Sequence, residues 1–232
     1  NDMWPGYKDG SDMPADILSQ FPLLEEAIFA LGIRLWPMTE FEADDALAAA
    51  AAAAASYPEV DRVLICSPDK DMAQSVVEQR VVQFDRRQGE IRDAAGVREK
   101  FGVDPESIPD YLALVGDSAD GFPGLKGWGA KTAATVLARY GHLESIPHDA
   151  AQWDIQVRGA TARAATLAEH EADALLFRDL ATLRTTIPVF DWLDDLRWTG
   201  PTPAFADVCD TLDAADYLRR AEALAQRPDD SA

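Results

Sequence analysis

The sequence is poor in basic residues. Lys and Arg number 21 against 41 Asp and Glu, so the 232 residues carry a formal net charge of −20. This balance argues against a protein that covers nucleic acid with a broadly basic surface, because phosphate binding requires positive charge. It leaves open a protein that concentrates carboxylates around metal ions and keeps only a local basic track.

Cysteine and long apolar runs are also scarce. The two cysteines, Cys66 and Cys209, form no CxxC pair, and Cys66 lies in an apolar run that predicts a buried thiol rather than a disulfide. No apolar run approaches the roughly 18 residues that a membrane span needs, and no signal peptide opens the sequence. We therefore expect a soluble, cytoplasmic protein without membrane contact, and a monomer.

Hydrophobic spacing predicts alternating helices and strands. The alanine-rich run from Asp45 to Ser56 contains almost no β-branched residue, which favours a helix. The apolar run from Arg62 to Cys66 is typical of a strand buried on both faces of a parallel sheet. The alternation predicts an α/β fold with a later helical layer. We expect helices over residues 14–31, 45–56, 97–101, 108–115, 130–140 and 160–183, and strands over 62–66, 81–84 and 89–92, with Gly32 and Gly141 ending two of the helices.

Glu42, Asp44 and Asp45 form an acidic cluster at the start of the alanine-rich helix. Glu42 and Asp45 are three residues apart and share a helix face, so the three acids could line the rim of a pocket. Acids in a first helical turn also stabilise the macrodipole and cap free N–H groups. Taken alone, the cluster is better explained by helix stabilisation.

Two more acidic pairs follow. Asp69 and Asp71 come directly after the predicted strand 62–66, and ligands of open α/β sheets bind just beyond the carboxyl ends of strands. Asp117 and Asp120 stand three apart in a glycine-rich turn. Ordinary turn and capping chemistry also explains either pair alone. The joint occurrence of three acidic clusters, two of them at element junctions, favours one shared site.

Carboxylates that converge need cations between them. Like charges ~4 Å apart repel by roughly 1 kcal/mol even in water, so such a site takes up metal ions or protons. Two magnesium ions about 4 Å apart can activate water and stabilise the leaving oxygen of a phosphate displacement. The candidate ligands are hard oxygens, and the histidines show no ligand spacing, which favours Mg²⁺ or Mn²⁺ over zinc. The histidines are His142, His148 and His170.

A glycine-rich hairpin, GLKGWGAKT over residues 124–132, leads into the helix predicted over residues 130–140. Glycine lets the backbone turn sharply and approach a partner, and the free N–H groups of a helix start bind anions. Lys126 and Lys131 add local positive charge. The hairpin therefore predicts a clamp that grips a DNA strand through its phosphates, although a glycine turn between two packed helices would look similar.

Three segments together resemble a known family. FEADD (41–45), SPDKD (67–71) and DYLALVGDSADGFPGLKGWGAKTAATVLARYG (110–141) are similar, in order and spacing, to the 5′-nuclease domain of bacterial DNA polymerase I and the related flap endonucleases. RDLATLRTTIPV (178–189) is similar to the segment that closes that domain. The resemblance covers about residues 1 to 190. Because no polymerase sequence follows, it implies a standalone 5′-3′ exonuclease with a PIN-like, Rossmann-like parallel-sheet core and a helix-hairpin-helix region.

The resemblance also implies roles for individual residues. Glu42 and Asp44 would bind one metal ion, with Asp69, Asp71 and Asp120 on the second. Asp45 and Asp117 would act as outer ligands through water. Lys8 would contact the scissile phosphate beside the aromatic Tyr7, and a potassium ion would bind at the helix-hairpin-helix. The implied catalytic residues are Lys8, Asp44, Asp69 and Asp71, and the implied DNA contacts are Tyr7, Lys8, Lys126, Gly127, Gly129, Lys131 and Thr132.

The sequence departs from the family pattern at three places. Ser11 stands where the family usually has an arginine, and Gly121 stands where an asparagine follows the last acid. The family's first strand, with its metal-binding aspartate, has no counterpart in the sequence. We expect a nuclease core over residues 1–110, a helix-hairpin-helix region over 111–190 and an acidic, solvated extension over 191–232.

Two functions remain open at this point, together with a more distant third. The resemblance implies a metal-dependent nuclease that hydrolyses DNA near a 5′ end or at a flap, as in DNA replication or repair. A DNA-binding protein of the same fold with weakened catalysis is the alternative, and an RNA-cutting relative is the distant option. The six acids of the metal pattern favour the nuclease, because a binding module has no use for so many of them. They are Glu42, Asp44, Asp69, Asp71, Asp117 and Asp120.

Overall fold

The computed structural model describes residues 3–8 and 13–227. It divides into two compact units, each formed by two stretches of the chain. Unit 1 comprises Asn1–Asp9 and Asp44–Ile187, and unit 2 comprises Gly10–Ala43 and Pro188–Ala232. Ser11, which stands at the family's arginine position, lies outside the described residues. Within the described part of the chain, no helix is long and apolar enough to cross a membrane.

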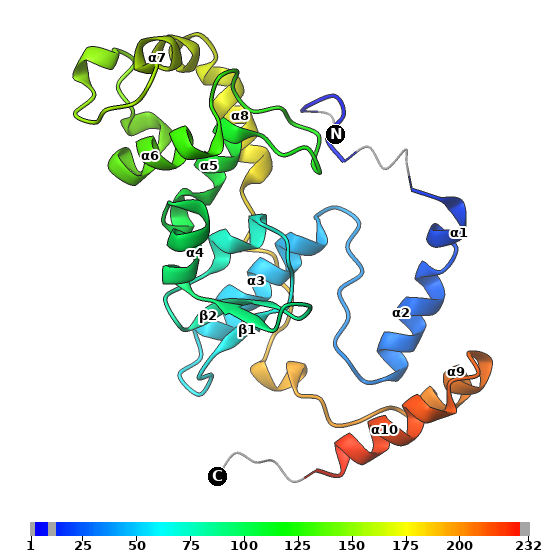
Figure 1. Cartoon of the computed structure of the whole chain (residues 1–232). Coiled ribbons are helices and arrows are strands. Elements are labelled where there is room, and N and C mark those ends of the chain that lie inside the picture. Colours follow the sequence, from blue (N-terminus) through cyan, green and yellow to red (C-terminus); the bar gives the residue numbers. More distant parts are fainter. Residues whose placement is uncertain (1–2, 9–12, 228–232) are drawn as a thin grey trace. The chain divides into compact units, whose positions relative to one another are not determined.

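A small mixed sheet forms one part of unit 1 (Figure 1). The central strand pairs in parallel with the first and antiparallel with the third, so Gln83 lies opposite Ile65 on one side and Arg92 on the other. Leu64 in the first strand is 45% exposed, so the prediction of a strand buried on both faces was wrong. The strands are β1 (Val63–Ile65), β2 (Val81–Asp85) and β3 (Glu90–Arg92).

The alanine-rich segment forms α3 (Ala43–Ala55), as predicted, and packs on the sheet. Ala48 and Ala51 are buried against Ile65, Met72 and Val81. Because alanine side chains end at Cβ, the helix backbone comes close to the strands. This packing fixes the carboxyl end of β1, from which the segment with Asp69 and Asp71 leaves the sheet.

The helical part of unit 1 follows the sheet in sequence (Figure 1). Phe122 and Phe177 stack with centroids 5.6 Å apart in its core, and α5 packs most extensively against α8. The helix predicted over residues 160–183 is divided at His170, whose φ of −116° leaves the helical region. The elements are α4 (Ala94–Phe101), α5 (Ile108–Val115), α6 (Ala130–Tyr140), α7 (Ala160–Glu169) and α8 (Glu171–Ala181), with short 3₁₀ turns η1 (Asp71–Ser75), η2 (Pro105–Ser107), η3 (Leu143–Ser145) and η4 (Ala150–Gln152).

Unit 2 is a small helical cluster with its own core. The helix predicted over residues 14–31 is divided around Ser19 and Gln20, and Gly32, with a φ of +79°, follows its end as predicted. The aspartates between residues 191 and 227 are exposed, as expected, yet this segment also contributes buried apolar side chains. The elements are α1 (Ala15–Leu18), α2 (Phe21–Ala30), η5 (Leu193–Leu196), α9 (Phe205–Thr211) and α10 (Ala215–Ala225).

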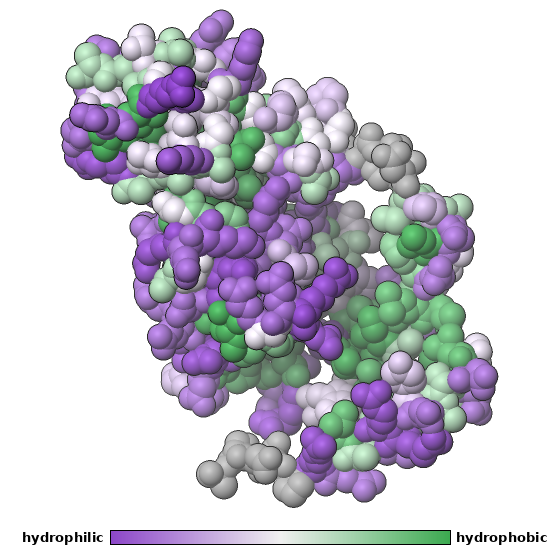
Figure 2. Space-filling model, viewed as in Figure 1, coloured by the Kyte–Doolittle hydropathy of each residue, from purple (hydrophilic) through white to green (hydrophobic). Residues whose placement is uncertain are grey.

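One face of α2 carries exposed apolar side chains. Figure 2 shows green, apolar surface where Figure 1 places this helix. Phe29 is 71% exposed and Leu24 is 55% exposed, while Ala30 is buried in the core of unit 2. The helix therefore has apolar side chains both on the face that it buries in unit 2 and on a face that is exposed.

The two thiols are free, as predicted, but their burial differs from expectation. Cys66 is exposed and Cys209 is buried. The prediction of a buried Cys66 was wrong because β1 already ends at Ile65, so the next side chain lies beyond the sheet. Cys209 instead packs in the core of unit 2 with Phe205 and Val208.

Two glycines with positive φ lie in the turn between α5 and α6, and substituting each of them tests how closely this turn packs. Gly124 has a φ of +66°, and an added Cβ would lie 2.3 Å from the backbone nitrogen of Gly116. Gly127 has a φ of +87°, but an added Cβ would meet nothing within 4 Å. We expect Gly127→Ala to lose about 1–2 kcal/mol for the backbone conformation alone, and Gly124→Ala to lose clearly more because of the clash. Urea unfolding measures both, and equal losses would contradict the close packing.

Candidate metal centre

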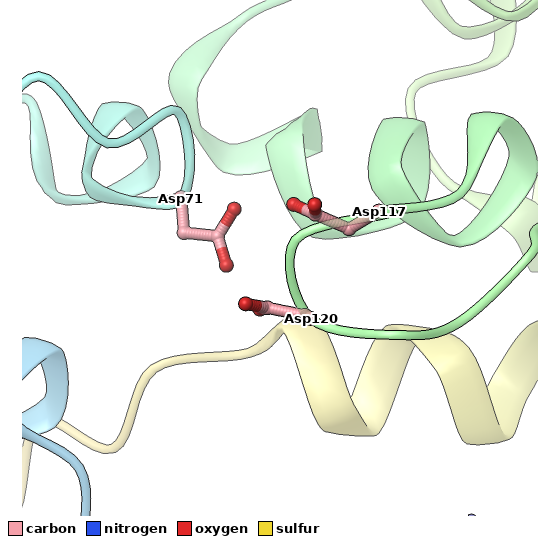
Figure 3. A group of neighbouring side chains, drawn as sticks. All are labelled: Asp71, Asp117 and Asp120. Atoms are coloured by element: carbon pink, nitrogen blue, oxygen red, sulfur yellow. The ribbon is translucent and has the colours of Figure 1, made fainter. Parts of the chain in front are cut away.

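Three buried carboxylates meet in unit 1 (Figure 3). Asp71, Asp117 and Asp120 each offer an oxygen atom, and these atoms all lie within 4.8 Å of one another. The residues are 4%, 1% and 7% exposed. Asp71 opens the turn η1, and the other two lie on the turn after α5. The structure thus brings together acids that are more than forty positions apart in the sequence.

The turn that carries Asp117 and Asp120 is closed by its own backbone. The N–H of Asp117 donates to the carbonyl of Phe122 at 2.8 Å, and the N–H of Gly121 donates to the carbonyl of Asp117 at 2.9 Å. Oδ1 of Asp117 accepts the N–H of Ala119 at 2.9 Å. Because the turn is fixed in this way, both carboxyl groups face the same space, as Figure 3 shows.

The electrostatics of this cluster favour a bound cation. Burial, and then the charges of Asp120, Asp69 and Asp117, raise the pKa of Asp71 to about 8. Burial also raises the pKa of Asp120, and the charge of Lys8 opposes that shift. Oδ1 of Asp71 and Oδ2 of Asp120 are buried, and neither has a hydrogen-bond partner among the described residues. A divalent cation would offset the negative charge of the buried acids and would also bind the oxygens that have no hydrogen-bond partner.

Two lysines partly neutralise the acids. Nζ of Lys70 lies 2.7 Å from Oδ2 of Asp117, and Nζ of Lys8 lies 3.3 Å from Oδ1 of Asp120. Lys8 was expected beside the site, whereas no role was expected for Lys70. Its position between Asp69 and Asp71 was the available signal. Each lysine is about one-third exposed, so both ammonium groups lie at the rim of the cluster.

The segment around Tyr7 is fastened to the acidic turn through Gly121. An added Cβ on Gly121 would lie 2.1 Å from the carbonyl oxygen of Gly6, so no larger residue fits there in this arrangement. The N–H of Lys8 donates to the carbonyl of Asp120 at 3.3 Å. Tyr7 is 8% exposed, and its hydroxyl donates to the carbonyl of Leu180 at 3.3 Å. The departure from the family at Gly121 therefore has a packing reason.

The other predicted ligands occupy different positions. Asp69 is exposed, and its Oδ1 accepts the N–H of Asp71, the first residue of the turn η1, at 3.2 Å. Asp44 is half-buried in the first turn of α3, and Asp45 is buried there, with Oδ1 accepting the N–H of Arg184 at 2.7 Å. Among the described residues of unit 1, none of these three belongs to the group within 4.8 Å. Glu42 is half-buried in unit 2.

The glycine hairpin presents backbone and charge to solvent. Lys126, Gly127, Gly129 and Lys131 are exposed, and Thr132 is half-buried. The helix α6 has no side-chain cap at Gly129. The N–H groups of Ala130 and Lys131 have no acceptor among residues 3–8 and 13–227. No carboxylate of the described chain lies within ion-pair distance of Lys126 or Lys131. These are the properties of an anion site at a helix start.

A buried acid fixes the segment that follows the C-terminal end of α6. Asp110, on α5, is 2% exposed. Its carboxylate accepts the N–H of Leu143 at 3.3 Å and a hydrogen bond from Arg178 at 3.2 Å, and it lies 2.8 Å from Nδ1 of His142. The group ties α5, α8 and the segment after α6 together. The hydrogen bonds of Asp110 therefore connect the helices on either side of the hairpin to α8.

Comparison with known proteins identifies the family. The profile of the N-terminal resolvase-like domain of 5′-3′ exonucleases matches residues 1–102, and that of the C-terminal SAM fold of 5′-3′ exonucleases matches residues 103–204. The chain belongs to the 5′-3′ exonuclease family. The match confirms the resemblance seen in the sequence and the α/β fold class with a helical second region.

The relatives are mostly longer proteins. DNA polymerase I of Pseudomonas aeruginosa is 35% identical over 207 residues, which are 84% of this chain and 22% of that protein. The 5′-3′ exonuclease of Aquifex aeolicus is 40% identical over 133 residues, which are 57% of this chain and 45% of that protein. The chain thus spans about a fifth of the polymerase and less than half of the exonuclease.

Two groups of solved structures share the fold. T5 5′-exonuclease with bound zinc ions has a TM-score of 0.52 at 20% identity, covering 82% of this chain and 62% of that one. The catalytic core of Rad2 in complex with a DNA substrate has a TM-score of 0.54 at 17% identity, covering 90% and 71%. At these identities the likeness concerns the fold.

The raised pKa of Asp71 predicts an unusual pH dependence of stability without metal. The unfolded chain releases this proton near pH 3.8, while the folded protein keeps it to about pH 8. Between these values the folded state binds more protons, so rising pH destabilises it. We expect the metal-free protein to lose stability from roughly pH 4 to 8, and Asp71→Asn to lessen that loss. Urea unfolding in the presence of a chelator measures the effect, and parallel profiles for both proteins would contradict the assignment.

Proposed function

We propose that the chain is a divalent-metal-dependent nuclease that hydrolyses DNA phosphodiesters near a 5′ end or at the base of a 5′ flap. The convergence of Asp71, Asp117 and Asp120 carries this proposal, because three buried acids in one place need cations, and Asp71 and Asp120 each have an oxygen without a hydrogen-bond partner among the described residues. Membership of the 5′-3′ exonuclease family supports it. The DNA in the Rad2 complex and the zinc in T5 5′-exonuclease support the classes of substrate and metal.

The donor set favours Mg²⁺ or Mn²⁺. All candidate ligands are carboxylate oxygens, which hard cations prefer. We assign one ion to Asp71 and Asp120, with Asp69 as a further ligand and Asp117 acting through water. A second ion would use Glu42 and Asp44, with Asp45 as an outer ligand. Bound there, such ions would polarise the phosphodiester and activate the attacking water.

The residues around the acids supply the remaining functions of the site. Lys8 is held at the rim by its ion pair with Asp120, where its ammonium group can move to a scissile phosphate. Tyr7 anchors this segment in the core through its hydroxyl. Lys70 shields Asp117 with its charge and so lowers the repulsion between the carboxylates when the site holds no substrate.

The hairpin supplies the DNA grip in this proposal. Lys126 and Lys131 offer charge, and Gly127 and Gly129 let the backbone approach phosphate, because an added Cβ at either position would meet nothing within 4 Å. Thr132 lies on the first turn of α6 at the same edge. We assign residues 111–190 to this DNA-binding region and residues 1–110 to the nuclease core. A potassium ion at the hairpin would join carbonyl oxygens to a DNA phosphate.

A cleavage assay with one acid removed tests the proposal. We expect the full chain to cut a labelled 5′-flap DNA with Mg²⁺ and not with EDTA, and Asp71→Ala to abolish cutting while DNA affinity changes little. Asp61→Ala removes an exposed acid of the same unit and should keep wild-type activity. Binding by the wild type without metal-dependent cutting would instead support the catalytically weakened DNA-binding protein. Full cutting by Asp71→Ala would reject the ligand assignment.

The hairpin charge can be tested through salt. Each phosphate contact contributes a slope of about −0.9 to the dependence of log affinity on log salt concentration. We expect Lys131→Ala to weaken binding of flap DNA and to flatten this slope by roughly that amount. Arg62→Ala removes an exposed cation outside the hairpin and should leave the slope unchanged. Fluorescence anisotropy at several salt concentrations measures it, and equal slopes for wild type and Lys131→Ala would exclude the contact.

A further inference from the structure

A fully buried amide lies beneath the segment that carries Asp69 and Asp71. Gln83 is 0% exposed and belongs to the central strand β2. It lies opposite Ile65, the last residue of β1, and opposite Arg92 of β3. Burying an amide is unfavourable unless its hydrogen bonds are satisfied, so the contacts of this side chain reveal its use.

Every polar atom of the Gln83 amide has a partner. Nε2 donates to the carbonyl of Ser67 at 2.8 Å and to the carbonyl of Asp69 at 2.5 Å. Oε1 accepts from Nη1 of Arg92 at 3.1 Å. The reversed amide would place its oxygen against two carbonyl oxygens and its nitrogen against a guanidinium, so this orientation is fixed.

Arg92 is itself fixed. It is 8% exposed, and Nη2 donates to Oε2 of Glu90 at 3.3 Å. Its stem packs under α4, where an added Cβ on Gly96 would lie 2.9 Å from Cγ of Arg92. The small residue on the helix leaves room for the arginine stem. A continuous chain of contacts therefore runs from the sheet edge at Glu90 to the backbone at Ser67 and Asp69.

The segment from Ser67 to Asp71 depends on this support. The N–H of Asp69 donates to Oγ of Ser67 at 3.2 Å, and the N–H of Asp71 donates to Oδ1 of Asp69 at 3.2 Å. These bonds give the segment its local shape. The bonds from Gln83 attach that shape to the sheet. Gln74 holds the other end, with Nε2 donating to the carbonyl of Asp71 at 2.9 Å.

We propose that Gln83, oriented by Arg92, is a positioning residue that fixes the segment Ser67–Asp71 so that the carboxylate of Asp71 meets those of Asp117 and Asp120. The proposal rests on the metal-dependent function proposed above. Gln83 acts through the backbone and touches neither metal nor substrate. Apolar side chains at positions 83 and 92 would be enough to pack β2 against β3. The amide of Gln83 in addition donates to two carbonyls beyond the end of β1.

Gln83→Glu tests the idea with little change of shape. A glutamate accepts from Arg92 as the glutamine does, but a carboxylate donates no hydrogen bond and a neutral carboxyl donates only one. The variant thus keeps the cross-strand contact and loses the attachment of the segment. Its added negative charge would by itself attract cations. Weaker metal binding therefore reports lost geometry rather than charge.

The measurement is Mn²⁺ binding by the full chain without DNA, followed by the loss of the free Mn²⁺ signal in electron paramagnetic resonance. We expect roughly tenfold weaker binding in Gln83→Glu, within the range found when groups that orient metal ligands are removed. Val82→Ala is the matched control, because it opens space at the neighbouring buried position of β2. It should lower the unfolding temperature and leave Mn²⁺ affinity unchanged.

The outcomes separate this inference from the function on which it rests. Wild-type Mn²⁺ affinity in Gln83→Glu would overturn the positioning role and leave the nuclease proposal standing. Absence of Mn²⁺ binding by the wild type would overturn both. If Gln83→Glu does not fold, the double variant Gln83→Leu with Arg92→Leu removes both side chains of the amide–guanidinium hydrogen bond, so neither is left buried without the other, while the carbonyls of Ser67 and Asp69 lose their donor. It should fold and show the same tenfold loss, and full affinity there would also overturn the positioning role.

Discussion

The mutual repulsion of three buried carboxylates is the constraint on which the site depends. Asp71, Asp117 and Asp120 lie close together in the interior, and burial, followed by the charges of the neighbouring carboxylates, raises the pKa of Asp71 to about 8. Lys8 and Lys70 compensate in part from the rim. The unsatisfied oxygens of Asp71 and Asp120 keep the site poised for a cation, because a cation is the ligand that relieves burial and repulsion together.

Holding such groups together requires rigid backbone on both sides. The turn after α5 is closed by its own hydrogen bonds, and Gly121 allows the chain at Gly6 to approach it. On the other side, the segment after β1 has almost no apolar side chain to bury, so polar side chains hold it from beneath. Gln83 and Gln74 do this through backbone carbonyls. The carboxylates are thus held together, against their repulsion, by hydrogen bonds that attach their loops to packed strands and helices.

Helices, turns and the positions of the acids could be predicted from the sequence, whereas contacts between distant segments could not. The helix over residues 130–140, its glycine stop and the acids after the strand at residues 62–66 follow from spacing and turn residues, and the structure agrees. The exposure of Cys66, the break at His170 and the partners of Lys70 and Gln83 depend on contacts between distant segments. Gln83 in particular lies between apolar neighbours in a strand, and nothing in that pattern distinguishes a glutamine that faces solvent from one that supports a loop.

The positions of the charged residues explain how so acidic a chain can belong to the 5′-3′ exonuclease family. Most of its excess acid is exposed surface, and many of its arginines are already paired with carboxylates, as Arg139 is with Asp154 and Arg178 with Glu144. Lys126 and Lys131 have no such partner among the described residues, and they stand beside unpaired backbone N–H groups at the start of α6. Because charge that is already paired contributes little to binding phosphate, the location of the free cations matters more than the net charge of −20. In the proposed function, the acids gather at the metal centre, and the free lysines stand where a phosphate backbone would pass.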